Sequence, residues 1–302
     1  MKRSGYLKGA AFGFAAASIW ASWGVVTRLA VTTGLDASDI AALRFGVAGV
    51  LLSPVLVRRG LARAQLGWLG LAAIIAGAGV PYALVASEGL RFAPAYDGSA
   101  LNPGFIPLFV ALIATVVLGE ELSNARKLGF LLMLAGGVLI VGRHPAAWSA
   151  SRSFGDALCL CAAFLWACFI VVMRQAKLDA LHAAALVSTG SLAVYLPIYV
   201  GLCGAHLAQL PLADLTVQAV FQGVCVAIVS LLFYGRAVTI LGASGGAAFA
   251  ALVPALSALL AIPLLSEWPG QIDWVGIVLI SVGVYMASRA PLPTRRLRAS
   301  GL

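Results

Sequence analysis

The stretch "IWASWGVVTR", from Ile19 to Arg28, returns as "LWACFIVVMR" from Leu165 to Arg174. The first tryptophan, the alanine after it, the Val-Val pair and the final arginine keep their places. A longer alignment, of 9–28 on 155–174, has nine identities in twenty positions. The chain therefore contains an internal repeat, and this repeat decides which fold we expect.

The alignment continues to the end of each half of the chain. Further matches follow in the same order, at 35–43 with 178–186, at 106–120 with 253–267, and at Gly129 and Gly136 with Gly276 and Gly283. The match at 106–120 also aligns Glu120 with Glu267. We predict two repeat units, residues 1–146 and 147–302.

Composition places these units in a membrane. The chain is 62% hydrophobic and 10% charged, whereas a soluble domain is about half apolar and a quarter charged. A spanning helix needs about 20 apolar residues. We expect an all-α membrane protein with ten transmembrane helices, at 8–30, 37–58, 65–87, 95–119, 127–143, 154–174, 181–203, 215–237, 242–266 and 272–289.

Five helices per unit is an odd number, so the second unit must enter the membrane from the opposite side. The result is a pair of inverted five-helix repeats, a construction that many secondary transporters use with the substrate near the midplane. A passive channel needs no such repeat. We therefore expect alternating access around a central site.

Charge sets the orientation of the helices. The net charge is +9, and the basic residues lie singly between apolar runs, so the sequence does not predict nucleic-acid binding. With the N-terminus inside, fifteen of the twenty Lys and Arg residues fall on the cytoplasmic side. This bias predicts that both termini are cytoplasmic. We expect a multi-pass protein of a bacterial inner membrane.

Several motifs carry a family resemblance. They are "IWASWGVVTR", "IAALRFGVAGVLL" (40–52), "PLFVALIATVVLGEEL" (107–122) and "KLGFLLMLAGGVLIV" (127–141). They resemble the EamA repeat of the drug/metabolite transporter superfamily over nearly the whole chain. The resemblance implies ten helices and export of metabolites, and the aromatic content is most similar to the aromatic amino acid exporters. The second copy departs from the pattern, because it lacks the arginine of the second helix.

Tryptophans mark the expected site. Membrane tryptophans ordinarily lie near helix ends, but Trp20 and Trp166 lie near the middle of matched helices. We expect them to face one central cavity from opposite halves, although packing within the bundle or against lipid would also place them there. Trp23 lies on the face of Trp20, and Phe169 on the face of Trp166.

Polar and aromatic residues on other helices complete this site. Ser99 and Asn102 lie one turn apart in a stretch interrupted by Pro103 and Gly104, and the Asn102 amide could bind substrate or join helices. The remaining expected substrate-binding residues are Tyr82, Tyr234 and Phe249.

Arg44 is a charge within the second predicted helix. An intramembrane charge is costly and usually functional. We expect Asp97 or Glu88 as its partner. Two interpretations stay open: a structural ion pair between helices, or a substrate-carboxylate anchor or gating charge.

These features favour a secondary exporter of small amphipathic metabolites, foremost amino acids including aromatic ones. A multidrug or nucleoside exporter of the same superfamily is the alternative, and by class a passive channel. The sequence has no metalloprotease HExxH, no serine-hydrolase GxSxG with its helical context and no Walker A lysine, so we expect neither an enzyme nor an ATP-driven pump. We expect no catalytic residues, no metal and no cofactor; the partners are the substrate and the bilayer. The sequence is silent on the oligomeric state.

Overall fold

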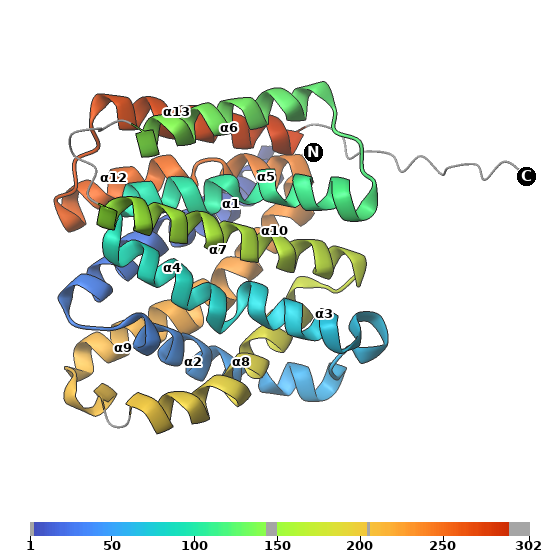
Figure 1. The fold of residues 1–302 in the computed structure, drawn as a ribbon. Coiled ribbons are helices and arrows are strands. Elements are labelled where there is room, and N and C mark those ends of the chain that lie inside the picture. Colours follow the sequence, from blue (N-terminus) through green and yellow to red (C-terminus); the bar gives the residue numbers. More distant parts are fainter. Residues whose placement is uncertain (1–2, 143–149, 204–205, 290–302) are drawn as a thin grey trace, which may run out of the picture.

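The computed structural model describes residues 3–142, 150–203 and 206–289, and all its regular elements are helices (Figure 1). Ten helical segments are long and apolar enough to cross a membrane, which confirms the predicted all-α membrane fold. The expected unit boundary at 146/147 lies outside the described residues.

The first unit holds five of these spans. They are formed by α1 (Arg3–Thr33), α2 (Ala37–Arg59), α3 (Arg63–Ala78) with α4 (Val80–Phe92), α5 (Ala95–Leu118) and α6 (Asn124–Gly142). The third span is longer than the predicted 65–87 and is divided at Gly79. The division has a local cause, because Pro81 in the first turn of α4 has no N–H to continue the α3 hydrogen bonds.

The second unit holds the other five spans. They are formed by α7 (Ala150–Gln175), α8 (Ala180–Cys203), α9 (Leu212–Val220) with η2 (Phe221–Val229) and α10 (Ser230–Leu241), α11 (Ala243–Ala250) with α12 (Val253–Leu265), and α13 (Gln271–Arg289). A short 3₁₀ turn, η1 (His206–Gln209), precedes α9. The middle of the eighth span, η2, is a π-helix, a rare form that often occurs at functional sites.

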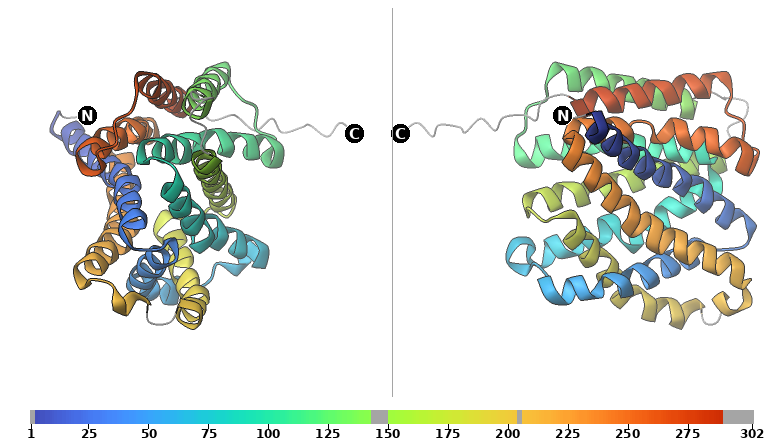
Figure 2. Two further views of the ribbon diagram at one scale, coloured as in Figure 1. Left: turned by 60° about the vertical axis from the view of Figure 1, so that its left-hand side comes forward. Right: turned by 180° about the vertical axis from the view of Figure 1, so that it is seen from behind.

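The helices form a bundle with two outer pairs. Helices α6 and α13 lie side by side at one edge, and α2 and α8 lie together at the other (Figures 1 and 2). Between the two edges, α1 packs on α10 and α12, while α7 packs on α3, α4 and α5. These two sets of contacts are equivalent, because the first span of each unit packs on the third and fourth spans of the other unit.

Glycines set the α6–α13 contact. A Cβ on Gly129 would lie 2.7 Å from the carbonyl oxygen of Gly283, and one on Gly136 would lie 2.6 Å from that of Gly276. The start of α6 thus meets the end of α13, so the two helices are antiparallel. Helices α2 and α8 are antiparallel too, because Arg59 pairs with Asp179 at one end of their contact, and Tyr195 bonds Ser38 at the other.

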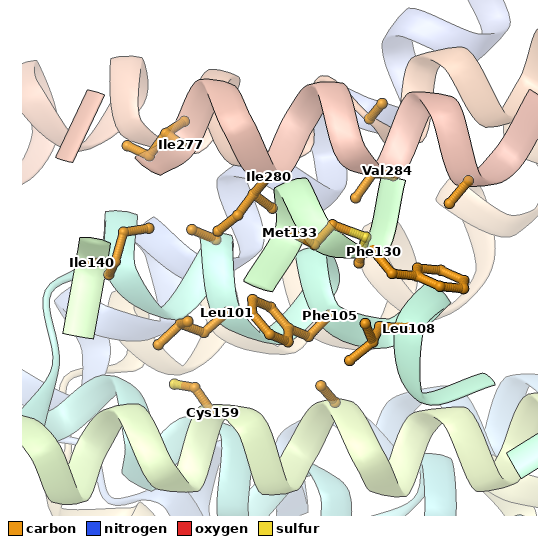
Figure 3. Packing of buried hydrophobic residues seen from close by; sticks show 14 of the residues in the cluster. Leu101, Phe105, Leu108, Phe130, Met133, Ile140, Cys159, Ile277, Ile280 and Val284 are labelled. Carbon is orange, nitrogen blue, oxygen red and sulfur yellow. The ribbon is translucent and has the colours of Figure 1, made fainter. Parts of the chain in front are cut away.

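The largest apolar core lies where α5 is enclosed by α6, α7 and α13 (Figure 3). Leu101 and Phe105 of α5 are buried between Ile280 of α13 and Cys159 of α7. Lipid tails are as apolar as these side chains, so in a bilayer the core is stabilised by van der Waals packing between the helices. This core holds α5 in place, and α5 carries Ser99 and Asn102.

Candidate functional site

Four aromatic side chains from three helices meet around Tyr82 at mid-bundle. The Tyr82 ring centroid lies 4.7 Å from that of Trp166 and 6.4 Å from that of Trp23. Phe169 extends the group, 5.4 Å from Trp166. We call these four residues, together with Asn102, the Tyr82 cluster. Both units contribute to it, since α1 and α4 belong to the first and α7 to the second.

Asn102 brings the amide to this cluster. Its Nδ2 donates to the Tyr82 hydroxyl at 3.3 Å, while its buried Oδ1 accepts no hydrogen bond from any described residue. Pro103 and Pro107 follow on the same helix and each remove one backbone N–H from the helical hydrogen bonds. One turn before Asn102, the Ser99 hydroxyl bonds that of Ser257 on α12 at 2.6 Å.

A second aromatic group surrounds Trp20. Its indole N–H donates to Ser230 Oγ at 3.0 Å, and its ring lies 5.0 Å from that of Tyr234 on α10. Phe249 of α11 packs against the same small core. We call Trp20, Tyr234 and Phe249 the Trp20 cluster. Trp20 and Trp166 therefore occupy two separate clusters, each facing a tyrosine from the third span of the opposite unit.

The sequence reasoning missed a glutamine network beside the Tyr82 cluster. Gln222, in the π-helix η2, accepts the Trp23 indole N–H at 3.1 Å and donates to the Thr27 hydroxyl at 3.0 Å. Its Nε2 also lies 3.3 Å from Gln218 Oε1. The signal was present, because two glutamines four residues apart in an apolar span share one helix face.

The prediction that Arg44 pairs with Asp97 or Glu88 is wrong. Asp97 pairs instead with Arg152, and Glu88 with Arg91, at 3.6 Å. Both acids lie near helix ends, and each forms its ion pair there with another arginine. Arg44 is 7% exposed, and its Nε has no hydrogen-bond partner among the described residues. Its neighbour Phe45 packs in the same buried cluster as Tyr82 and Trp23.

Two ion pairs tie the units together at opposite ends of the bundle. At the end of α1, Arg28 bonds Glu267 at 3.0 Å and the carbonyl oxygens of Leu90 and Arg91 at 2.7 Å. At the end of α7, Arg174 bonds Glu120 at 2.8 Å. The sequence repeat aligns these arginines with each other and these glutamates with each other.

A charged group lies near the start of α2. Ligand atoms of Asp36, Asp39 and His206 lie within 4.8 Å of one another, a composition that suits a cation, although the sequence predicted no metal site. Asp36 already pairs with Arg91, and Asp39 accepts from Tyr199. Beside them is an open pocket of about 320 Å³ lined by Asp36, Ala37, Ser38, Leu84, Glu88 and Arg91.

Comparison with known proteins agrees with this architecture. The sequence model of the EamA-like transporter family matches residues 7–142 and again residues 153–289. A solved crystal structure aligns over the full length of both chains with a TM-score of 0.59 and 20% identity, which shows a shared fold.

Named relatives are transporters. An uncharacterized transporter of Archaeoglobus fulgidus is 28% identical, covering 89% of this chain and 93% of the relative. The "probable terminal-alkyne amino-acid exporter" of Streptantibioticus cattleyicolor is 27% identical, covering 88% and 90%. The riboflavin transporter of Brucella anthropi is 33% identical, covering 53% and 55%.

Proposed function

The chain belongs to the EamA-like transporter family, and on this premise we propose that it exports small amphipathic metabolites, foremost amino acids with aromatic side chains. The family makes it a membrane transporter rather than an enzyme. The observation that carries the substrate class is the Tyr82 cluster, which combines aromatic faces with one amide at mid-bundle.

The chemistry of this cluster separates candidate substrates. Aromatic rings bind apolar and aromatic side chains through offset or edge contacts. A lipophilic drug cation would instead favour a carboxylate at the centre, and the Tyr82 cluster has none. One observation favours a second candidate: a relative is a riboflavin transporter, and a flat heteroaromatic ring also suits stacking.

We propose that transport proceeds by alternating access of two inverted repeats. Two matches of one family model support the repeat. The antiparallel contacts of α6 with α13 and of α2 with α8 support the inversion, because each pair joins equivalent spans. In such folds the two units exchange conformations around a central site.

We propose that both termini face the cytoplasm of a bacterium, with the chain in its inner membrane. The distribution of Lys and Arg supports this orientation. A C-terminal fluorescent protein that folds only in the cytoplasm should be bright, and a periplasm-dependent phosphatase fused there should be inactive. The reverse pattern would overturn the orientation.

The function is tested by counterflow in proteoliposomes. Vesicles preloaded with unlabelled phenylalanine should accumulate external labelled phenylalanine transiently, because a carrier exchanges substrates across the membrane. Riboflavin, a nucleoside and a lipophilic cation serve as competitors. A passive channel gives no transient accumulation. Counterflow of labelled riboflavin into vesicles preloaded with riboflavin, with no phenylalanine exchange, would move the function to the second candidate.

A further inference from the structure

Arg44 carries a positive charge that the described protein does not neutralise. It lies on α2 and is 7% exposed, and its buried Nε has no hydrogen-bond partner among the described residues. Its guanidinium carbon lies 5.4 Å from the ring of its neighbour Phe45, and Phe45 packs in the buried cluster that holds Tyr82 and Trp23. A buried guanidinium is costly unless an anion reaches it. The missing anion is therefore expected from outside the protein.

Asn102 brings an unpaired acceptor to the same tyrosine. The residue is 2% exposed, and its Nδ2 is used by the Tyr82 hydroxyl. Its Oδ1 is buried and accepts nothing from the described residues. Buried polar atoms are nearly always paired in native proteins. An unpaired acceptor beside the proposed site therefore points to a ligand that donates an N–H.

We infer that Arg44 and Asn102 bind the charged headgroup of an α-amino acid, with Arg44 on the carboxylate and Asn102 Oδ1 on the ammonium. This inference rests on the proposed function and adds the headgroup site to it. A guanidinium matches a carboxylate with two parallel hydrogen bonds. An amide oxygen accepts from an ammonium. The substrate side chain then lies toward Trp23 and Trp166, which face Tyr82.

The test compares three ligands that share one aromatic ring. They are L-phenylalanine, L-phenylalaninamide, which lacks the carboxylate, and 3-phenylpropionate, which lacks the ammonium. Each is titrated calorimetrically into the purified full-length chain and into three variants, Arg44→Met, Arg44→Lys and Asn102→Leu. Arg63→Met is the matched control, since Arg63 is exposed and lies over Trp68, away from the Tyr82 cluster.

Each variant should lose a different pair of ligands. Arg44→Met should weaken the binding of phenylalanine and 3-phenylpropionate by about tenfold or more, and the binding of phenylalaninamide by less than about threefold. Asn102→Leu should weaken the binding of phenylalanine and phenylalaninamide and leave the affinity for 3-phenylpropionate unchanged. Arg44→Lys keeps the charge but not the paired hydrogen bonds, so it should bind phenylalanine with intermediate affinity. Arg63→Met should resemble wild type.

The outcomes separate this inference from the proposed function. If wild type binds phenylalanine but Arg44→Met weakens the binding of all three ligands equally, Arg44 has a structural role and the headgroup site is overturned. If Arg44→Met does not fold, Arg44→Lys decides: phenylalanine affinity equal to wild type overturns the anchor, and a selective loss supports it. Wild type that binds none of the three ligands overturns the proposed function and this site with it.

Discussion

At the scale of residues, side chains from different helices meet at a single tyrosine. Asn102 Nδ2 donates to the Tyr82 hydroxyl, and the Trp166 ring lies 4.7 Å from the Tyr82 ring. The sequence predicted Tyr82, Asn102 and the tryptophans as separate candidates on different helices. It could not predict which of them meet, because contacts between helices depend on rotations that an apolar pattern leaves open.

Replacing Trp166 by Ala should reduce phenylalanine counterflow more than replacing Trp20. Trp166 contacts the Tyr82 cluster directly, whereas Trp20 lies in the other cluster against Tyr234. The lost ring contact is worth about 0.5–1.5 kcal/mol beyond the buried area. Trp68→Ala is the control, because Trp68 is 64% exposed. Counterflow rates are normalised to the amount of protein in the membrane. A lower rate for Trp20→Ala than for Trp166→Ala would contradict this prediction.

Gln222→Leu should destabilise the protein. The side chain is fully buried and joins the Trp23 indole to the Thr27 hydroxyl, so leucine leaves both groups without this partner. A buried unsatisfied group costs about 1–3 kcal/mol. Thermal melting in detergent should show a lower midpoint than wild type. Gln175→Leu at the exposed end of α7 is the control, and equal melting of both variants would remove Gln222 from the structural network.

At the scale of elements, apolar runs predicted all ten spans, and most ends agree within a few residues. The breaks were less predictable. Pro81 is a visible cause of the division at Gly79, but the π-helix η2 has no such marker in the sequence. A π-helix depends on tertiary contacts, and here η2 packs against α2 and places Gln222 beside Trp23. The local sequence alone does not encode that packing.

Gly136→Ala should weaken the α6–α13 pair. The new methyl would lie 2.6 Å from the backbone oxygen of Gly276, and a backbone atom yields less easily than a side chain. Overpacking of this kind costs about 1–3 kcal/mol. Gly142→Ala on the same helix is the matched control, since its nearest neighbour would be 3.9 Å away. Melting curves should separate the two variants; a wild-type midpoint for Gly136→Ala would mean that the helices can move apart.

At the scale of the whole molecule, two aligned ion pairs occupy opposite ends of the bundle. Arg28–Glu267 and Arg174–Glu120 each join the first span of one unit to the end of the fourth span of the other. Helix α5 begins beside Glu267, whose Oε2 accepts the Ala95 N–H at 2.7 Å, and it ends just before Glu120. The sequence repeat predicted the alignment of these residues but not their pairing, because the partners come from different units.

Under alternating access, each pair must open when its own end opens, so breaking one pair should favour opening at that end alone. Glu267→Gln should raise the labelling rate of a single cysteine at Ser38, beside the pocket near Arg91, in a variant without the five native cysteines. Glu120→Gln should lower this rate, because it favours opening at the Arg174 end. Both pairs are less exposed than the Arg59–Asp179 pair, and removing one partner of a less exposed pair costs more than removing one of an exposed pair. Asp179→Asn, which breaks the exposed Arg59 pair, is therefore expected to leave the rate unchanged. Rates that rise in both glutamate variants would mean that the pairs only hold the bundle together, and would separate them from the transport cycle.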